Sequence, residues 1–133
     1  SGKKFRQVKI GNYGIADLIT FDRPSYMVRK GDNGGWHHEA IVNIYELKQN
    51  KVNIHTVLQA IRYAVGLTEY FKMRGFERYE LNYTVIGREI DIQSDFIYLP
   101  NFMLNLRVLT YDYKLDGICF TEHSGYKLIN NGF

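Results

Sequence analysis

The sequence contains a single cysteine, Cys119, and this shortage excludes several classes of protein. One cysteine cannot form an internal disulfide or a cysteine-based zinc site, so a disulfide-stabilised scaffold is excluded. Cys119 lies in the apolar run 117–120, where we expect a buried core thiol. A thiol used in this way is typical of a reducing compartment, and we expect a cytoplasmic protein.

Long hydrophobic runs and a secretory signal are also missing. The apolar runs are far shorter than the roughly 18 residues that a bilayer-spanning helix needs, so no membrane partner is expected. The chain opens with Ser1 and Gly2 and has no initial methionine, which is typical of the scar left when an expression tag is cut off.

The excess of positive charge is small, with a formal net charge of +3 from 17 Lys and Arg against 14 Asp and Glu. This balance permits an anionic partner without requiring one, so an argument for nucleic acid depends on motifs. The apolar fraction of 45% and the charged fraction of 23% are typical of a globular protein and exclude a wholly disordered chain. The length fits a single domain covering residues 1–133.

The pattern of apolar and β-branched residues predicts strands along most of the chain. The expected strands cover residues 4–10, 15–21, 40–48, 78–86, 106–113 and 117–122. The last two form a C-terminal hairpin, and two glycines predict a turn at 11–14. Residues 22–39 are interpreted as a long loop or an irregular hairpin, whereas 91–104 are ambiguous between a strand and a short helix.

A long amphipathic helix, at about 54–74, is predicted between Asn53, a good N-cap, and Gly75, a good residue just after a helix C-terminus. Apolar residues recur there at helical spacing: Ile54, Val57, Leu58, Ile61, Ala64, Val65 and Phe71. The opposite side carries a second set: His55, Gln59, Arg62, Tyr63 and Gly66. The strand before the helix is apolar enough to be a central strand covered on both faces. The order strand, helix, strand predicts a crossover between parallel strands, and hence an α/β fold.

Polar residues stand out near the ends of these elements. Asp17 lies inside an otherwise apolar strand. Glu46 and Lys48 are separated by one residue near the end of the next strand, so their side chains project from the same face. Such strand ends are where α/β sheets usually carry their sites. Gln59 and Tyr63 are four residues apart on the helix and share one face.

Three groups of residues, in the same order along the chain, resemble the motifs of the PD-(D/E)xK nuclease superfamily and its RecB-like branch: Gly14 and Asp17, then Glu46-Leu47-Lys48, then Gln59 and Tyr63. The resemblance covers residues 11 to about 86. It implies a restriction-endonuclease-like core, with a mixed central β-sheet flanked by helices. The activity that it implies is metal-dependent hydrolysis of phosphodiester bonds, with DNA as the expected substrate and partner.

The same resemblance implies a role for each residue. Asp17 and Glu46 would hold Mg²⁺ or Mn²⁺, with the backbone carbonyl of Leu47 as a third ligand. Mg²⁺ prefers oxygen ligands and keeps several waters, so two carboxylates suffice. Lys48 would orient or deprotonate the attacking water. Gln59 and Tyr63 would position the end of the nucleic acid or support the metal ligands.

Basic residues near these motifs are candidates for binding nucleic acid, because cations neutralise phosphates. They are Arg23, Arg29 and Lys30 in the segment 22–39, and Arg62 on the helix. If this interpretation is right, the segment 22–39 lies over the site as a mobile flap. That segment also makes the gap between Asp17 and Glu46 longer than is usual in the superfamily, and no acidic N-terminal helix precedes Asp17.

Other interpretations remain open. A second acid-x-lysine motif, Asp112-Tyr113-Lys114, shows that such a motif arises by chance. Four histidines are alternative metal ligands for zinc: His37, His38, His55 and His123. The chain could instead be a nuclease-fold module that binds nucleic acid or a protein without cleaving, or a structural protein. A nuclease of this kind is also compatible with a homodimer or a larger assembly.

Overall fold

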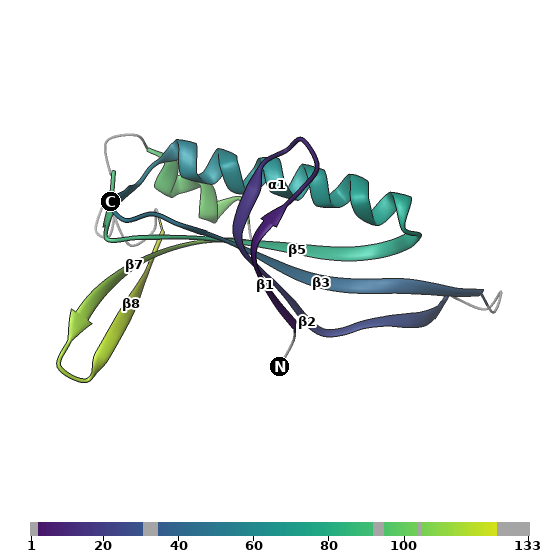
Figure 1. Ribbon diagram of the computed structural model, residues 1–133. Coiled ribbons are helices and arrows are strands. Elements are labelled where there is room, and N and C mark those ends of the chain that lie inside the picture. The colour runs from purple at the N-terminus through teal and green to yellow at the C-terminus, as the bar shows by residue number, and fades with distance from the viewer. Residues whose placement is uncertain (1–2, 31–34, 92–94, 104, 125–133) are drawn as a thin grey trace. The chain divides into compact units, whose positions relative to one another are not determined.

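The computed structural model describes residues 3–30, 35–91, 95–103 and 105–124, and among these it describes the side chains of all but 23–30, 35–40 and 77. The elements follow the order β1 (Lys3–Lys9), β2 (Ile15–Lys30), β3 (Gly35–Leu47), β4 (Lys51–Val52), α1 (Ile54–Met73), β5 (Phe76–Gly87), β6 (Glu89–Ile90), the 3₁₀ helix η2 (Phe96–Asn101), β7 (Leu106–Lys114) and β8 (Gly117–His123). Figure 1 shows their course.

The fold is α/β, with a mixed six-stranded sheet and one main helix. The strand order in the sheet is β1-β2-β3-β5-β7-β8, and β4 and β6 form a separate two-stranded sheet. The pairs β1–β2 and β7–β8 are antiparallel, whereas β5 and β7 are parallel. β3 and β5, the long strands that come before and after α1 in the sequence, are neighbours in this sheet.

By its contacts the chain divides into two compact units. Unit 1 consists of residues 1–44 and 61–82, and unit 2 consists of residues 45–60 and 83–133.

The tight turn between β1 and β2 in unit 1 depends on glycine. The Ile10 N–H donates to the Gly14 carbonyl over 2.9 Å, and the Tyr13 N–H donates to the Ile10 carbonyl over 2.8 Å. Gly14 has a φ of +125°, and a Cβ there would lie only 2.8 Å from the ring of Tyr63 on α1. Glycine is required at this position both for the backbone angle and for the close approach of the ring.

The core of unit 1 is built around the ring of Phe71, near the end of α1. Its centroid lies 6.4 Å from that of Phe21 on β2, 5.2 Å from Phe76 and 5.5 Å from Tyr79 on β5. Edge-on and tilted ring pairs at these separations are favourable beyond their burial. This cluster therefore joins the C-terminal half of α1 to strands on both sides of β3 in the sheet order.

The predicted ends of α1 are confirmed. The Asn53 side-chain oxygen accepts from the backbone N–H groups of His55 (3.0 Å) and Thr56 (3.3 Å), as an N-cap does. Gly75, with φ at +78°, follows the last turn, and its N–H donates to the Lys72 carbonyl.

The predicted face of α1 is wrong in part. Leu58 and Val65, expected in the core, are 49% and 50% exposed. Tyr63 and Gly66, expected on the opposite side, are buried instead. The buried residues of the helix recur at three- and four-residue spacing: Thr56, Val57, Ala60, Tyr63, Ala64, Leu67 and Phe71. Tyr63 is buried because glycine at position 14 leaves room for its ring, which no pattern within the helix reveals.

Unit 2 contains the expected C-terminal hairpin, in which β7 and β8 pair from Val108 with His123 to Lys114 with Gly117. Its buried apolar residues come from the start of α1, from β4, β5 and β7, and from η2: Val52, Val57, Ala60, Val85, Phe96, Ile97, Leu106 and Val108. Cys119, predicted to be buried, is only half-buried on β8, because β8 is an edge strand of the sheet.

Two other expectations are settled by the backbone. The segment 22–39 extends β2 and β3 on either side of residues 31–34, so it is largely strand rather than loop. The ambiguous segment 91–104 contains the short helix η2, with Phe96 and Ile97 buried.

β3 is an inner strand, as predicted, but its burial alternates: Val42 and Ile44 are fully buried, whereas Asn43 and Tyr45 are half-buried. Over residues 41–46, therefore, one face of β3 is closed to water and the other is only partly covered.

Candidate functional site

The acid and the lysine of the E-x-K motif converge in unit 2, as their spacing predicts. Glu46 is only 3% exposed, and its Oε2 atom lies 4.0 Å from the Lys48 Nζ atom. The Lys48 side chain is 35% exposed, so its ammonium reaches both the carboxylate and solvent. Burying an ionised carboxylate is costly unless a cation or hydrogen-bond donors compensate it. The end of β3 thus holds a buried acid beside a partly hydrated cation.

The backbone around this pair is held by short hydrogen bonds. The Lys48 N–H donates to the Ile86 carbonyl of β5 over 2.8 Å, and the Arg88 N–H donates to the Asn50 carbonyl over 2.9 Å. A Cβ on Gly87 would lie 2.9 Å from that same Asn50 oxygen, so the close approach requires glycine. These contacts fix the chain on both sides of Lys48.

The second acid-x-lysine motif has a different environment. Asp112 and Lys114 on β7 are both exposed, and the Asp112 carboxylate accepts from the backbone N–H of Tyr113 over 2.9 Å. This local hydrogen bond is typical of a solvated aspartate. Burial of the acid, which the sequence did not reveal, separates Glu46 from its chance counterpart.

Asp17 lies on β2 in unit 1, as predicted, and is half-buried. Its Oδ1 atom accepts a hydrogen bond of 3.4 Å from the side-chain amide of Gln7 on β1. Gln7 has a φ of +50°, in the left-handed region that costs a non-glycine residue about 1–2 kcal/mol. Backbone strain of this kind is a known feature of functional sites, and here it lies next to a candidate metal ligand.

The three candidate residues of α1 have different environments. Gln59 is half-buried in unit 2. In unit 1, Tyr63 is 6% exposed and packs on Gly14, whereas its neighbour Arg62 is exposed. Arg62 is therefore accessible to a phosphate, and Tyr63 is held in the interior. The basic side chains of Arg23, Arg29 and Lys30 lie outside the described side chains, although their backbone belongs to β2.

The sequence also predicts four histidines as alternative ligands for zinc. Within the described residues, no group of three or more His, Cys, Asp or Glu side chains could hold a metal ion. His123 bonds to the hydroxyl of Thr110 over 2.7 Å, and His55 lies in the first turn of α1. His37 and His38 lie outside the described side chains.

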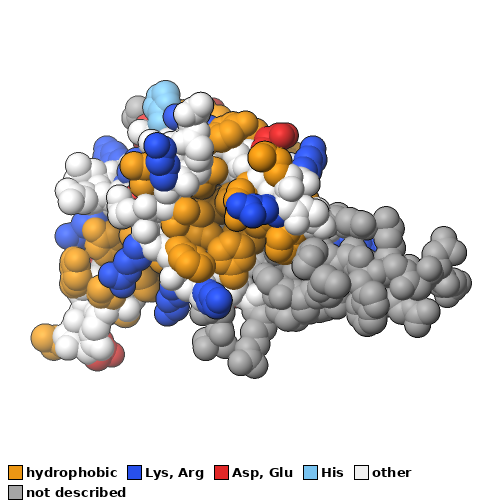
Figure 2. Space-filling view, turned by 45° about the vertical axis from the view of Figure 1, so that its right-hand side comes forward, with side chains coloured by type: hydrophobic (Ala, Val, Ile, Leu, Met, Phe, Trp, Pro, Cys, Tyr) orange, Lys and Arg blue, Asp and Glu red, His pale blue; other side chains and the backbone are white. Residues whose placement is uncertain are grey.

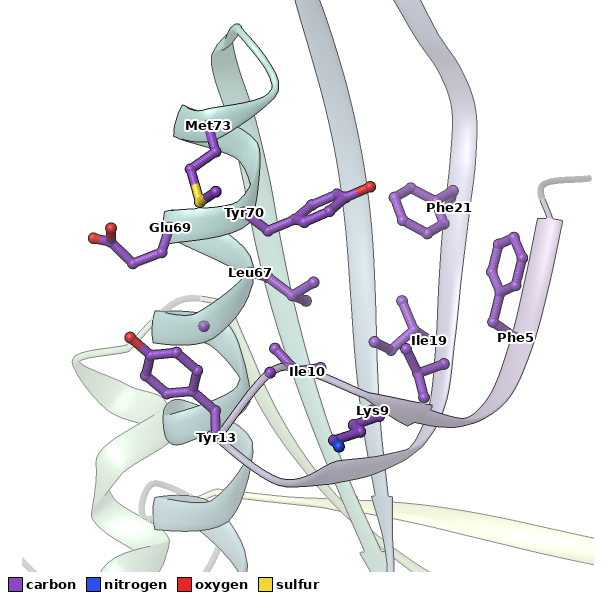
Figure 3. Close-up of a pocket in the computed structure, with 13 residues that line it drawn as sticks. Phe5, Lys9, Ile10, Tyr13, Ile19, Phe21, Leu67, Glu69, Tyr70 and Met73 are labelled. Atoms are coloured by element: carbon purple, nitrogen blue, oxygen red, sulfur yellow. The ribbon is translucent and has the colours of Figure 1, made fainter.

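Sequence reasoning missed an apolar groove in unit 1. It has a volume of about 500 Å³ and lies between the β1–β2 hairpin and the C-terminal half of α1. Figure 3 shows the Tyr70 ring pointing across it toward Phe21, with Leu67 and Ile10 lying further down the groove beside the helix. Figure 2 shows hydrophobic side chains gathered on one face of the protein, with Lys and Arg side chains around them. The only sequence signal is Gly66, a glycine within a helix, against which Ile10 and Tyr13 pack.

Comparisons with known proteins found no family model, no curated protein and no solved structure that matches this chain. Within the described segments, no helix combines the length and the apolar character that crossing a membrane requires. A functional assignment must therefore come from the residues themselves.

Proposed function

We propose that this protein is a divalent-metal-dependent nuclease that hydrolyses phosphodiester bonds of DNA. In this proposal Asp17 and Glu46 hold the metal ion and Lys48 activates the attacking water. We also propose that its α/β fold has a restriction-endonuclease-like core.

The observation that carries the proposal is the buried carboxylate of Glu46 beside the partly exposed ammonium of Lys48. A surface strand end would leave both groups hydrated, as Asp112 and Lys114 are. A buried acid costs stability, and functional sites often carry such costs. The pair therefore supports a chemical role more strongly than the motif alone.

The donor set suits Mg²⁺ or Mn²⁺. Two carboxylates and one backbone carbonyl, that of Leu47, are hard oxygen ligands, and such ions complete their shell with water. When bound, the metal ion would neutralise the phosphate oxygens and lower the pKa of a coordinated water. The described residues contain no group of three or more His, Cys, Asp or Glu side chains that could hold a metal ion. The proposed site needs only two acidic side chains, so this finding is compatible with the proposal.

In this proposal Lys48 acts on a water molecule or a phosphate and is not a metal ligand. Its ammonium lies beside Glu46 yet keeps contact with solvent, so it can hold a water molecule or a phosphate oxygen next to the carboxylate. Buried Tyr63 fits a supporting role, whereas exposed Arg62 fits a phosphate contact. Gln59 is half-buried and fits either role.

One observation favours a second candidate, a nuclease-fold module that binds nucleic acid or protein without cleaving it. The ammonium of Lys48 lies 4.0 Å from the Glu46 carboxylate and offsets part of its charge without a metal. In this reading the pair has a structural role only.

The test is cleavage of labelled single- and double-stranded DNA with Mg²⁺ or Mn²⁺, repeated with excess EDTA. We expect metal-dependent products that disappear in EDTA, in Glu46→Gln and in Lys48→Ala. The matched controls are Asp112→Asn and Lys114→Ala, which change the same residue types in the exposed motif. Absence of cleavage under all conditions, with DNA still bound, would favour the binding module. Equal losses in the control variants would refute the assignment to Glu46 and Lys48.

A further inference from the structure

The C-terminal hairpin of unit 2 exposes one apolar face. Tyr111 lies opposite Phe120, and Tyr113 lies opposite Ile118, so all four side chains project from the same face of the hairpin. Tyr113, Ile118 and Phe120 are 62%, 53% and 58% exposed. Large apolar side chains gathered in this way mark an interaction surface more often than isolated ones do.

A cation completes this face. The guanidinium carbon of Arg88 lies 5.7 Å from the ring centroid of Tyr111 and 5.5 Å from that of Tyr113. The two rings themselves are 5.8 Å apart in an edge-on arrangement. Cation–π contacts at this range hold an arginine in place while its remaining N–H groups stay available. Tyr111, Tyr113, Ile118, Phe120 and Arg88 are together called the aromatic face below.

The charge of the aromatic face is positive. An acid on the same side of the hairpin, Glu122, is already in an ion pair with Arg107, at 3.2 Å from its Nε atom. Asp112 projects from the opposite side, because it pairs with Cys119 and alternates with Tyr111 and Tyr113. Neither of these two acids is paired with Arg88, which contacts the two tyrosine rings, so an anionic partner is complementary to its charge.

Short backbone links join the aromatic face to the candidate site within unit 2. Lys48 is hydrogen-bonded to Ile86, only two residues before Arg88. Gly87 pairs with Thr110, the residue before Tyr111. The aromatic face therefore begins one strand away from the end of β3.

We propose that the aromatic face binds an unpaired stretch of DNA, with bases stacked on Tyr113 and Phe120 and a phosphate held by Arg88. This inference rests on the proposed nuclease function and gives its substrate a single-stranded region. Aromatic rings stack on bases of any sequence, and arginine adds the phosphate contact, which together are the means of single-strand binding. If a second copy of the chain bound through the same face, the positive charges of the two Arg88 side chains would repel each other. DNA, which is negatively charged, is therefore the better-matched partner.

The experiment measures binding of a fluorescein-labelled oligothymidylate to the full chain by anisotropy, in EDTA so that no cleavage occurs. Tyr113→Ala and Phe120→Ala should each weaken binding by about 5- to 150-fold, the range measured for loss of one base–aromatic stack. Arg88→Ala should lower the slope of log affinity against log salt by about 0.7. One control is Phe102→Ala, an aromatic residue outside the hairpin that is 87% exposed. The other is Lys114→Ala, an exposed cation on the opposite face of the hairpin. Both should bind as the wild type does.

Three results would overturn the inference. The first is unchanged affinity in Tyr113→Ala and Phe120→Ala, and the second is no binding of the oligonucleotide by the wild type. The third is a dimer of the wild-type chain in light scattering that Tyr113→Ala converts to a monomer, since the face would then be covered by a second copy. Cleavage of duplex DNA that requires Glu46 would stand in each of these cases, so loss of the inference is distinguishable from loss of the proposed function.

Discussion

The Nζ atom of Lys48 lies 4.0 Å from the Oε2 atom of Glu46, two residues earlier on the chain. The acid is almost fully buried and the ammonium is partly in water, so the pair spans the boundary between core and solvent. A substitution of Lys48 changes a group that water already reaches, whereas a substitution of Glu46 changes a buried group. Its two members should therefore respond differently to substitution.

Glu46→Gln should remove cleavage while lowering stability only modestly. The substitution weakens the ion pair with Lys48, but it keeps the shape of the side chain and leaves Lys48 able to turn to solvent. We therefore expect a loss of only about 1–2 kcal/mol in the free energy of unfolding. Urea unfolding measures this loss. Asp112→Asn is the matched control and should change stability by less than about 0.5 kcal/mol, because its side chain is exposed. A larger loss in the control than in Glu46→Gln would contradict the burial argument.

Lys48→Ala should abolish cleavage and leave metal binding nearly intact, because Lys48 is not proposed as a ligand. It should also lower the free energy of unfolding, since the buried Glu46 carboxylate loses a neighbouring cation. Lys48→Arg should rescue only in part, since a guanidinium with a pKa above 12 cannot act as a base. Titration calorimetry with Mn²⁺ measures metal binding, and the rate of DNA cleavage measures activity. Wild-type rates in Lys48→Ala would remove this residue from the mechanism.

Gly14→Ala and Gly75→Ala form a matched pair for the turn of unit 1. Both glycines have positive φ, but a Cβ at Gly75 would meet nothing within 4 Å, whereas one at Gly14 would lie 2.8 Å from the Tyr63 ring. We expect Gly75→Ala to cost about 1–2 kcal/mol from the backbone alone. Gly14→Ala should cost more, because the ring must also move. Equal losses by thermal or urea unfolding would show that Tyr63 adapts without strain.

Stability should fall at alkaline pH partly through Tyr83. Burial raises the pKa of this phenol above 10.0, because the ionised form is poorly solvated. In the unfolded chain Tyr83 ionises near its ordinary pKa. Its contribution to the free energy of unfolding is therefore fully present below about pH 10 and is lost as the pH rises through the pKa of the folded state. In Tyr83→Phe the free energy of unfolding should therefore decline less steeply above pH 10. The same slope in both proteins would show that Tyr83 does not contribute.

The double variant Arg29→Ala, Lys30→Ala tests the nucleic-acid role predicted for β2. Each lost phosphate contact should lower the slope of log affinity against log salt by about 0.7–0.9. Cleavage at saturating DNA should change far less, because these residues are not expected to touch the scissile phosphate. Lys3→Ala with Lys4→Ala is the control, since it removes two exposed cations from β1. Identical slopes in the Arg29 and Lys30 variant and in the wild type would leave the segment 22–39 without a binding role.

Most of the secondary structure could be predicted from the sequence, because it depends on interactions between residues that are close together in the chain. Asn53 and Gly75 mark the ends of α1, because an amide cap and a positive φ act on their immediate neighbours. The C-terminal hairpin and the turn between β1 and β2 follow equally short patterns. The convergence of Glu46 and Lys48 is also local, since alternate residues of a strand share a face.

Only the tertiary structure decided which side chains are buried and what they meet. Leu58 is as apolar as the core residues of α1 yet is exposed, and Tyr63 is buried only because Gly14 leaves space for it. The stacking of Arg88 on two tyrosines joins residues more than twenty positions apart, through the pairing of β5 with β7. Such contacts depend on which strands become neighbours, and no periodicity within one element carries that information. The same reason explains why burial distinguishes Glu46 from Asp112, although the two motifs look alike in the sequence.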